Sequence, residues 1–264
     1  MEKTKEELIL YEVQDGIAVV RLNNPPHNIF DRAMSSRMEE ILTQIESDTD
    51  LRVVIFTSVG KTFNAGSDMR EILDYIESGT YIDDKMVHEL RNRDRIAAIA
   101  VPTIAAVDNQ VYGGGFEMIL SCDMIIAAPD VEFCMATADI GSFPGAGGGP
   151  RLVRLIGRSR ALEHMYFSRK MTSAQALDWG LVNAIAEGGS ALELALEWAG
   201  ELAKKPGISM RSVKELVLGM TSPDDGYLFD LQQRISGKVI EAGKLEEGIR
   251  FFFAEREKRK KISG

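Results

Sequence analysis

The sequence predicts an α/β fold, in which a core of buried strands and helices is followed by a helical C-terminal region. Short apolar runs, typical of strands buried on both faces, recur through the first two thirds of the chain. Stretches with helical periodicity separate these runs, and helical patterns dominate the last third. No clean repeat or low-complexity linker interrupts the pattern. We therefore expect a core over residues 1–200 and a helical extension over residues 201–264.

The first elements can be assigned in chain order. Residues 17–22 are typical of a strand, and the Asn and Pro residues of 23–28 predict a turn. Asp31 is a suitable N-cap for a helix running to about Glu46. Its apolar face is formed by Met34, Met38, Ile41, Leu42 and Ile45.

The rest of the chain follows the same alternation. Residues 53–56 predict a buried strand, followed by a loop and two helical stretches up to Ala100. Gly180 is expected to close a short helix over residues 173–179. The remaining strands are expected at 103–107, 124–128, 131–135 and 181–185, and the remaining helices at 191–204, 207–218, 227–242 and 246–259.

Charge and hydropathy exclude several kinds of partner. The net charge of −9 argues against a broad nucleic-acid surface. The basic run 256–261 is either a solvated helix end or a local site for an anionic ligand. The N-terminus is too polar for a signal peptide, and no apolar run approaches the ~18 residues that a membrane span requires. We expect a cytoplasmic protein without a membrane segment.

The cysteines and histidines do not indicate a metal or disulfide chemistry. Cys122 and Cys134 lie in apolar runs, which favours buried free thiols over a disulfide or a reactive centre. The three histidines, His27, His88 and His164, lack metal-ligand spacing. We therefore expect no metal site.

Two turns of small residues are the strongest candidates for a binding site. Residues 64–68 and 113–115 both lie where an apolar run ends and a helix can begin. Small residues allow a ligand to approach bare backbone N–H groups. If the two turns meet, one N–H from each could hold a carbonyl oxygen. Asp68 would also cap the following helix, which is compatible with this role.

Glu117 is the candidate acid–base group. It follows the glycines closely, and we expect it in the first turn of a helix whose N-terminus would keep it ionised. Its neighbours are apolar, and burying a carboxylate near apolar surface costs free energy. A glutamate at this position therefore favours a functional role. A surface glutamate beside a plain structural turn is the alternative.

A third glycine-rich segment, residues 143–150, resembles a phosphate loop only superficially. It lacks the Gly-Lys-Ser/Thr ending of a Walker A motif. Pro150 and the weak preceding strand also fit a Rossmann fingerprint poorly. We expect a rigid loop that forms a pocket wall.

Taken together, these segments resemble the crotonase, or enoyl-CoA hydratase/isomerase, superfamily over roughly residues 15–256. The resemblance implies a spiral of ββα units with a helical C-terminal trimerisation region, and a homotrimer or homohexamer. It also implies an acyl-CoA thioester as substrate, with coenzyme A as part of that substrate and no prosthetic group. The matching segments are 24–28 (NPPHN), 63–68 (FNAGSD), 113–117 (GGGFE) with Cys122 and Asp123, 140–148 (IGSFPGAGG), 174–182 (AQALDWGLV) and 247–252 (EGIRFF).

The resemblance also implies roles for individual residues. Ser67 and Gly114 would supply the two N–H groups of an oxyanion hole, and Glu117 matches the first of two catalytic glutamates. Pro26 and His27 would lie along the coenzyme. The other residues implied to contact the substrate or its coenzyme are Ala65, Asp68, Gly113, Phe252 and Arg256. A lysine of the family at the CoA phosphates is replaced by Glu255 here, and Arg256 or Lys258 would take over its role.

The chain departs from the family pattern at the second glutamate, where it carries Thr137. A threonine hydroxyl can position water but is a poor proton carrier near neutral pH. Asp139 would face the same side as Thr137 if this segment were extended, and could then assist.

Three functions remain open at this level. The first is enoyl-CoA hydration, with Glu117 holding the water and Thr137 or Asp139 assisting. The second needs one carboxylate or none: double-bond isomerisation, or decarboxylation of a malonyl-type acyl-CoA. Segment 112–119 is similar to that of methylmalonyl-CoA decarboxylases. The third is a non-catalytic scaffold or RNA-binding relative, against which the acidic charge and the intact Ser67, Gly114 and Glu117 positions argue.

Overall fold

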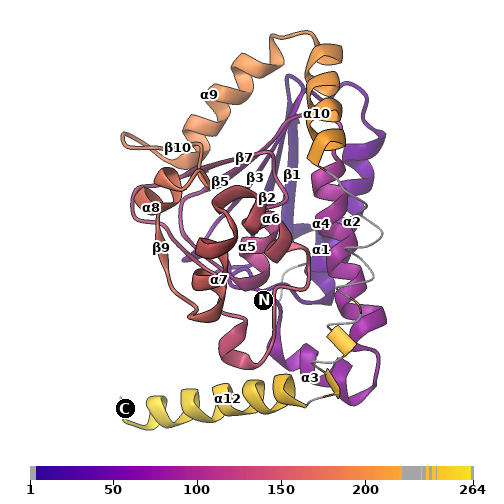
Figure 1. Cartoon of the computed structure of the whole chain (residues 1–264). Helices are drawn as coiled ribbons and strands as arrows, with labels where there is room; N and C mark the ends of the chain where they lie inside the picture. The colour runs from indigo at the N-terminus through magenta and orange to yellow at the C-terminus, as the bar shows by residue number, and fades with distance from the viewer. Residues whose placement is uncertain (1–3, 222–232, 234–235, 238–239, 242, 263–264) are drawn as a thin grey trace.

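The computed structural model describes residues 4–221, 233, 236–237, 240–241 and 243–262 (Figure 1). Strands and helices alternate through the first two thirds of the chain, and helices follow, which confirms the α/β class expected from the sequence. Within the described residues, no helix combines the length and the apolar character needed to cross a bilayer.

Six strands form the larger sheet, in the order β1-β2-β3-β5-β7-β10. The β1 and β2 strands form an antiparallel hairpin, and every later pair is parallel. The tenth strand is shorter than the expected strand at 181–185, and β1 precedes the first expected strand. The bounds are β1 (Ile9–Gln14), β2 (Ile17–Leu22), β3 (Val53–Ser58), β5 (Thr103–Val107), β7 (Met124–Ala127) and β10 (Ala184–Ile185).

Four short strands form a second sheet, in the order β4-β6-β8-β9. The first three are parallel, and β9 closes the sheet in the antiparallel sense. The sequence indicated a loop where β4 lies, because a strand of three residues shows no usable periodicity. The bounds are β4 (Thr62–Asn64), β6 (Gln110–Tyr112), β8 (Glu132–Cys134) and β9 (Met171–Thr172).

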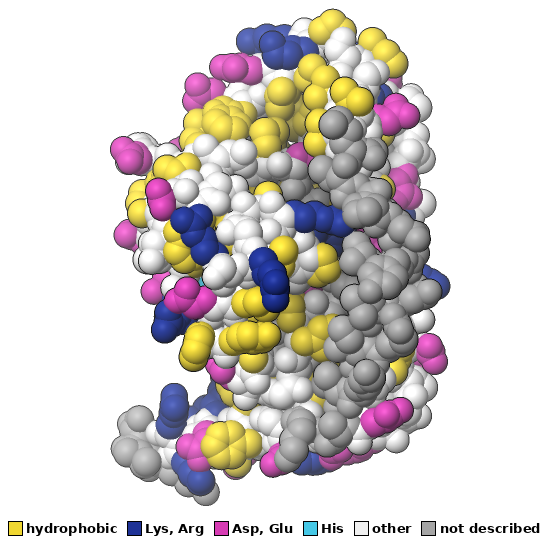
Figure 2. Space-filling model, viewed as in Figure 1, with side chains coloured by type: hydrophobic (Ala, Val, Ile, Leu, Met, Phe, Trp, Pro, Cys, Tyr) yellow, Lys and Arg dark blue, Asp and Glu magenta, His cyan; other side chains and the backbone are white. Residues whose placement is uncertain are grey.

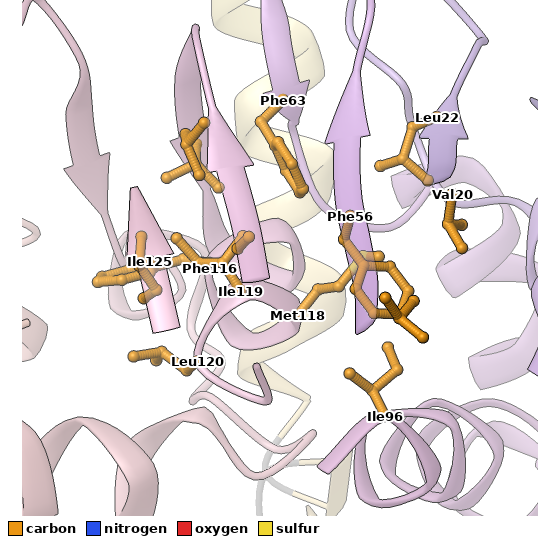
Figure 3. Packing of buried hydrophobic residues seen from close by; sticks show 14 of the residues in the cluster. Val20, Leu22, Phe56, Phe63, Ile96, Phe116, Met118, Ile119, Leu120 and Ile125 are labelled. Carbon is orange, nitrogen blue, oxygen red and sulfur yellow. The ribbon is translucent and has the colours of Figure 1, made fainter. Parts of the chain in front are cut away.

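The alternation of side chains along β3 explains why this strand is apolar on both faces. Val53 and Ile55 pack with α9 (Ala191–Ala203) on one side of the larger sheet. Val54 and Phe56 point to the other side, into the main core shared with the second sheet. Phe56, Phe63 and Phe116 lie in this core in Figure 3. The two sheets are thus joined through one apolar layer.

Two helices of the first half, those after Asp31 and Asp68, begin where the sequence predicts, whereas the first helix of the chain was not expected. Asp31 caps α2 (Arg32–Ser47) by accepting a 2.8 Å hydrogen bond from the Met34 N–H, and the predicted apolar face of this helix is buried. Asp68 caps α3 in the same way. The other elements of this half are α1 (Lys5–Leu8), α3 (Met69–Glu77), the π-helix η1 (Tyr81–Met86), α4 (Val87–Ala98) and α5 (Gly113–Ile119).

The second half is mainly helical, as expected. Gly180, with φ of 78°, follows α8 as predicted. Helix α12 (Lys244–Ile262) runs away from the body toward the C-terminus (Figure 1). The helix expected over 227–242 falls largely outside the described residues. The remaining elements are the 3₁₀ helix η2 (Ala138–Ile140), α6 (Gly148–Ile156), α7 (Arg158–Tyr166), α8 (Ser173–Asp178) and α10 (Gly207–Thr221).

Candidate active site

The two small-residue turns of the sequence lie against each other in the structure. They follow β4 and β6, which run parallel as neighbours in the second sheet. A Cβ added to Gly66 would lie 3.5 Å from the Gly114 nitrogen, and one added to Gly114 would lie 4.0 Å from the Ser67 nitrogen. The two backbone segments therefore lie close together at their glycines.

The N–H of Ser67 has a defined direction. Phe30 N–H donates a 2.9 Å hydrogen bond to the Gly66 carbonyl, and Phe30 C=O accepts one from Asp68 N–H at 3.1 Å. The Gly66 C=O and the Ser67 N–H belong to one planar trans peptide and point in opposite directions. The Ser67 N–H therefore points away from Phe30.

The N–H of Gly114 is also unused. Gly114 is the second residue of α5, and the first N–H groups of a helix have no partner within it. In the described part of the chain, no acceptor is bonded to the N–H of Ser67 or Gly114. Two free donors thus lie on neighbouring turns, an arrangement suited to a carbonyl oxygen that gains negative charge.

Buried asparagines hold the first turn in place. The Asn64 Oδ1 accepts a 2.8 Å hydrogen bond from the Gly66 N–H. The amide of Asn28 donates to the carbonyls of Val59 and Thr62. A Cβ on Gly115 would come within 2.4 Å of the Asn64 carbonyl oxygen, so only glycine allows this approach between the turns.

Glu117 lies beside the paired turns and is only 4% exposed. Its Oε1 accepts hydrogen bonds of 2.9 Å from the N–H groups of both Ala146 and Gly148. Gly148 begins α6, so the helix N-terminus at the carboxylate is that of α6. The expectation that Glu117 occupies the first turn of its own helix is wrong, because α5 begins at Gly113 and Glu117 is its fifth residue.

Burial raises the pKa of Glu117 to about 7, although the hydrogen bonds from Gly148 and Ala146 and the charge of Arg93 act in the opposite direction. The charge of Glu89 adds to the upward shift. A carboxyl group with a pKa near neutrality can both donate and accept a proton under ordinary conditions. Glu117 therefore has the properties of an acid–base group.

Three charged side chains on one face of η1 and α4 extend the site, and the sequence analysis missed them. Lys85, Glu89 and Arg93 follow one another at intervals of four residues. Lys85 is 4% and Arg93 1% exposed. The Lys85 Nζ lies 3.0 Å from Glu89 Oε1, and the Ser67 hydroxyl donates to the same oxygen at 2.6 Å.

Lys85 and Arg93 act on the pKa of Glu89 in the direction opposite to burial. Burial by itself raises the pKa of Glu89, but the charges of Lys85 and Arg93 and the hydrogen bonds from Ser67 and Lys85 outweigh it and lower the pKa. The spacing was the available signal in the sequence. It was hidden because half of the other residues of 83–95 are also charged, as in a solvated helix.

Tyr81 connects η1 to the same region. Burial raises the pKa of its phenol, with further contributions from the charges of Glu89 and Glu117. Its hydroxyl is hydrogen-bonded to Ser142. Both carboxylates are thus close enough to act on one buried phenol.

The segment expected to lie along a coenzyme is adjacent to the first turn. The Pro26 carbonyl accepts a 2.8 Å hydrogen bond from Lys61 N–H. The His27 carbonyl accepts one from Ala65 N–H at 3.0 Å, and the His27 side chain is exposed. Pro26, His27 and Ala65 are thus brought together.

The segment carrying Thr137 and Asp139 differs from the expectation. It is not extended: Thr137 precedes the 3₁₀ helix η2, and the Thr137 carbonyl accepts hydrogen bonds from Ile140 and Ser142. The prediction that alternation brings residues 137 and 139 to one side is therefore wrong. Asp139 is exposed, while Thr137 is half-buried.

Phe252 and Arg256 lie on α12, away from the paired turns. The first half of α12 packs on α3 and η2, with Leu245 and Ile249 buried against Ile72. Phe252 and Arg256 follow on the exposed part of the helix that extends from the body (Figure 1). Within one chain, the structure does not bring them to Ser67 and Gly114.

Both cysteines are free, with Cys134 buried and Cys122 half-buried. Burial lowers the pKa of His164 to about 4. In the part of the chain that the structure describes, no three His, Cys, Asp or Glu side chains are grouped so that they could hold a metal ion.

The α/β fold with two sheets is that of an enzyme family that acts on CoA thioesters. Residues 12–261 match the enoyl-CoA hydratase/isomerase family, and the chain belongs to that family.

Three similar proteins illustrate the relationship. Mevalonyl-coenzyme A hydratase SIDH of Beauveria bassiana is 33% identical over 259 residues, covering 92% of this chain and 90% of its own length. Enoyl-CoA hydratase domain-containing protein 2, mitochondrial, of Mus musculus is 37% identical, with coverages of 86% and 75%. The crystal structure of enoyl-CoA hydratase from Bacillus halodurans superposes with a TM-score of 0.85 at 19% identity, covering 92% of this chain and 99% of that chain.

Proposed function

We propose that this enzyme catalyses the reversible addition of water to a 2-enoyl-CoA thioester. The observation that carries the proposal is the proximity of the turns that hold Ser67 and Gly114, whose N–H groups have no acceptor in the described part of the chain, with Glu117 on the helix that follows Gly114. The names of similar proteins support the choice, because several are hydratases of CoA thioesters.

The thioester oxygen would accept hydrogen bonds from the Ser67 and Gly114 N–H groups. Water adds at C3, and the electron pair of the double bond moves toward C2, so that negative charge gathers on the thioester oxygen. Donors already fixed in place stabilise this charge without reorganisation. Glu117 was expected from the sequence to hold the water. Because its pKa is about 7, we assign it instead to carry the proton to C2 and to take it back in the reverse direction.

The coenzyme would lie along the side of the first turn. Pro26, His27, Ala65, Asp68 and Gly113 would contact the CoA part of the substrate, and the hydrogen bond from Ala65 N–H to the His27 carbonyl supports this by joining two of them. No separate prosthetic group is needed for this reaction, because the thioester itself supplies the electron sink.

Phe252 and Arg256 would contact coenzyme bound to another copy of the chain, since α12 carries them away from their own turns. This requires a homo-oligomer, and we propose a homotrimer or a homohexamer. Figure 2 shows hydrophobic side chains gathered at the end of the molecule that carries α9 and α10. They include Ile208, Val213 and Leu216 of α10, which are 73%, 57% and 64% exposed. Exposed apolar surface of this kind marks an interface.

Isomerisation or decarboxylation of an acyl-CoA is the second candidate. It is favoured by one observation: η2 places an exposed Asp139 and a half-buried Thr137 where a second glutamate is expected in hydratases. Moving a double bond needs one proton carrier. Decarboxylation forms the enolate by breaking a C–C bond and removes no proton.

Incubation with crotonyl-CoA, a 3-enoyl-CoA and methylmalonyl-CoA, followed by mass spectrometry, separates these functions. Gain of water from crotonyl-CoA supports hydration. A change of absorbance without a change of mass supports isomerisation, and loss of carbon dioxide supports decarboxylation. Absence of turnover and of thioester binding would contradict the whole proposal and favour a scaffold.

A further inference from the structure

The proposed hydration needs two proton movements, and Glu117 accounts for one of them. A proton must reach C2, and the water that adds to C3 must lose one. Thr137 is a poor proton carrier, and the exposed Asp139 lies on a turn rather than on the face that was expected. Another carboxylate is therefore needed to accept the proton that the water loses.

We propose, resting on the hydration function above, that Glu89 is the second carboxylate of the active site and binds the water that adds to C3. It lies on α4 one turn before the buried Arg93 and one turn after the buried Lys85 of η1. Its Oε1 is bound to the Ser67 hydroxyl at 2.6 Å. Ser67 is one of the two donors proposed for the thioester oxygen, so Glu89 is hydrogen-bonded to a residue of the proposed oxyanion hole.

The two glutamates are held in the same manner. In Glu117, Oε1 accepts two backbone hydrogen bonds and Oε2 has no partner among the described residues. In Glu89, Oε1 accepts from Ser67 and Lys85, and Oε2 likewise has no partner in the described part of the chain. One oxygen of each carboxyl group fixes its position, and the other is left for a ligand. Neither is sealed, since the Glu89 side chain is 12% and Glu117 is 4% exposed.

A purely structural ion-pair network would be expected to close on itself, because unpaired buried charge is costly. This one does not. The Nε and Nη1 atoms of Arg93 are buried without a partner, and no hydrogen bond joins Arg93 to the free oxygen of Glu89. The open network favours a role for Glu89 beyond packing.

The environments of the two glutamates shift their pKa values in opposite directions. The charges of Lys85 and Arg93 keep Glu89 ionised, whereas burial holds the pKa of Glu117 near 7. Pairs of groups whose pKa values are pushed apart are typical of an acid and a base. The charges of both carboxylates also contribute to the raised pKa of the Tyr81 phenol.

The reaction step balances with these two groups. The water oxygen forms a bond to C3 as one water O–H breaks, and its proton passes to Glu89. The electron pair of the C2–C3 double bond forms a C–H bond at C2 with the proton of Glu117. After the step Glu89 is neutral and Glu117 is ionised. A proton transfer from Glu89 to Glu117 restores the starting state.

The test is a comparison of two reactions in the full-length Glu89→Gln variant. Hydration of crotonyl-CoA should fall by about 100-fold or more. Butyryl-CoA binding and exchange of its C2 hydrogen with D₂O should be little changed, because exchange needs only Glu117 and the two N–H donors. Asp84→Asn, at an exposed carboxylate of η1, is the matched control and should hydrate normally.

Hydration near the wild-type rate in Glu89→Gln would overturn the proposal. Equal losses of hydration and of C2 exchange would also overturn it, because they indicate that Glu89 has a structural role. Wild-type hydration without C2 exchange would also overturn it. If the variant does not fold, Glu89→Asp retains the charge between Lys85 and Arg93 but withdraws the carboxylate, and the same split is expected. No turnover by the wild type contradicts the hydration function itself, whereas the other outcomes concern Glu89 alone.

Discussion

Gly148 and Glu117 are in such close contact that no side chain fits between them. A Cβ at position 148 would lie 2.4 Å from the Glu117 Cγ, while the Gly148 N–H donates a 2.9 Å hydrogen bond to Glu117 Oε1. In the glycine-rich loop of residues 143–150, the N–H groups of Ala146 and Gly148 are thus directed at the Glu117 carboxylate. The loop delivers a helix N-terminus to a buried carboxylate.

We expect Gly148→Ala to displace Glu117 and to lower turnover strongly while leaving coenzyme binding largely intact. The added methyl group also overpacks the site and should destabilise the fold by about 1–3 kcal/mol. Steady-state kinetics with crotonyl-CoA and thermal unfolding measure the two effects.

Gly200→Ala is the control for this substitution. Gly200 lies within α9, and a Cβ there meets nothing within 4 Å. Alanine should therefore raise stability slightly, by roughly 0.5–1 kcal/mol, without changing activity. Equal activity of the two variants would contradict the contact between positions 148 and 117.

The pKa of Glu117 also predicts a pH-dependent stability. Its carboxyl group has a pKa of about 7 when folded, above the ordinary value of 4.5, so the folded chain holds the proton more tightly than the unfolded chain. Its contribution is fully present below pH 4.5 and is lost as the pH rises to about 7. Glu117→Gln cannot titrate and should gain stability relative to the wild type across this interval, by up to ~3 kcal/mol.

Thermal unfolding of both proteins between pH 4.5 and 9 measures this difference. The two curves should separate as the pH rises and run parallel above neutrality. A constant difference over the whole range would show that Glu117 titrates normally.

Asn64 is expected to hold the first turn in register. Asn64→Ala leaves the Gly66 N–H and the Asn28 carbonyl without their buried partner. The loss should destabilise the fold by about 1–3 kcal/mol and lower turnover through displacement of Ser67. Denaturant unfolding and kinetics test this, and unchanged stability would show that another group replaces the amide.

Several parts of this arrangement could be predicted from the sequence because they depend on local chemistry. The cap at Asp31, the buried strand ending near Phe56 and the glycine at 180 each follow from propensities within a few residues. The meeting of residues 64–68 with 113–115 was only a condition at the sequence level, because it depends on the pairing of β4 with β6 and the sequence indicated a loop where β4 lies.

Other parts depend on contacts distant in the sequence. Nothing near Glu117 indicates that its hydrogen bonds come from Ala146 and Gly148. The burial of Lys85 and Arg93 depends on where α4 packs, and their own segment has the composition of a surface helix. The η2 turn replaced an expected extended segment because the Thr137 carbonyl bonds forward to Ile140 and Ser142.

The proposed assembly leads to a prediction for α10. Leu216→Glu places a charge on an apolar side chain that is 64% exposed in the single chain. If this surface joins copies of the protein, the variant should dissociate toward smaller species. Size-exclusion chromatography with light scattering measures the mass, and Glu215→Gln on the same helix is the control. An unchanged trimer or hexamer would place the interface elsewhere.

The proposed catalysis depends most on two backbone N–H groups, those of Ser67 and Gly114, acting on one thioester oxygen. The direct measurement is the infrared spectrum of butyryl-CoA, labelled with ¹³C at the thioester carbonyl, bound to the Glu117→Gln variant. We predict a carbonyl band shifted to lower frequency than in the free thioester, because both donors polarise the bond. A bound thioester whose carbonyl band remains at its free position would contradict the account.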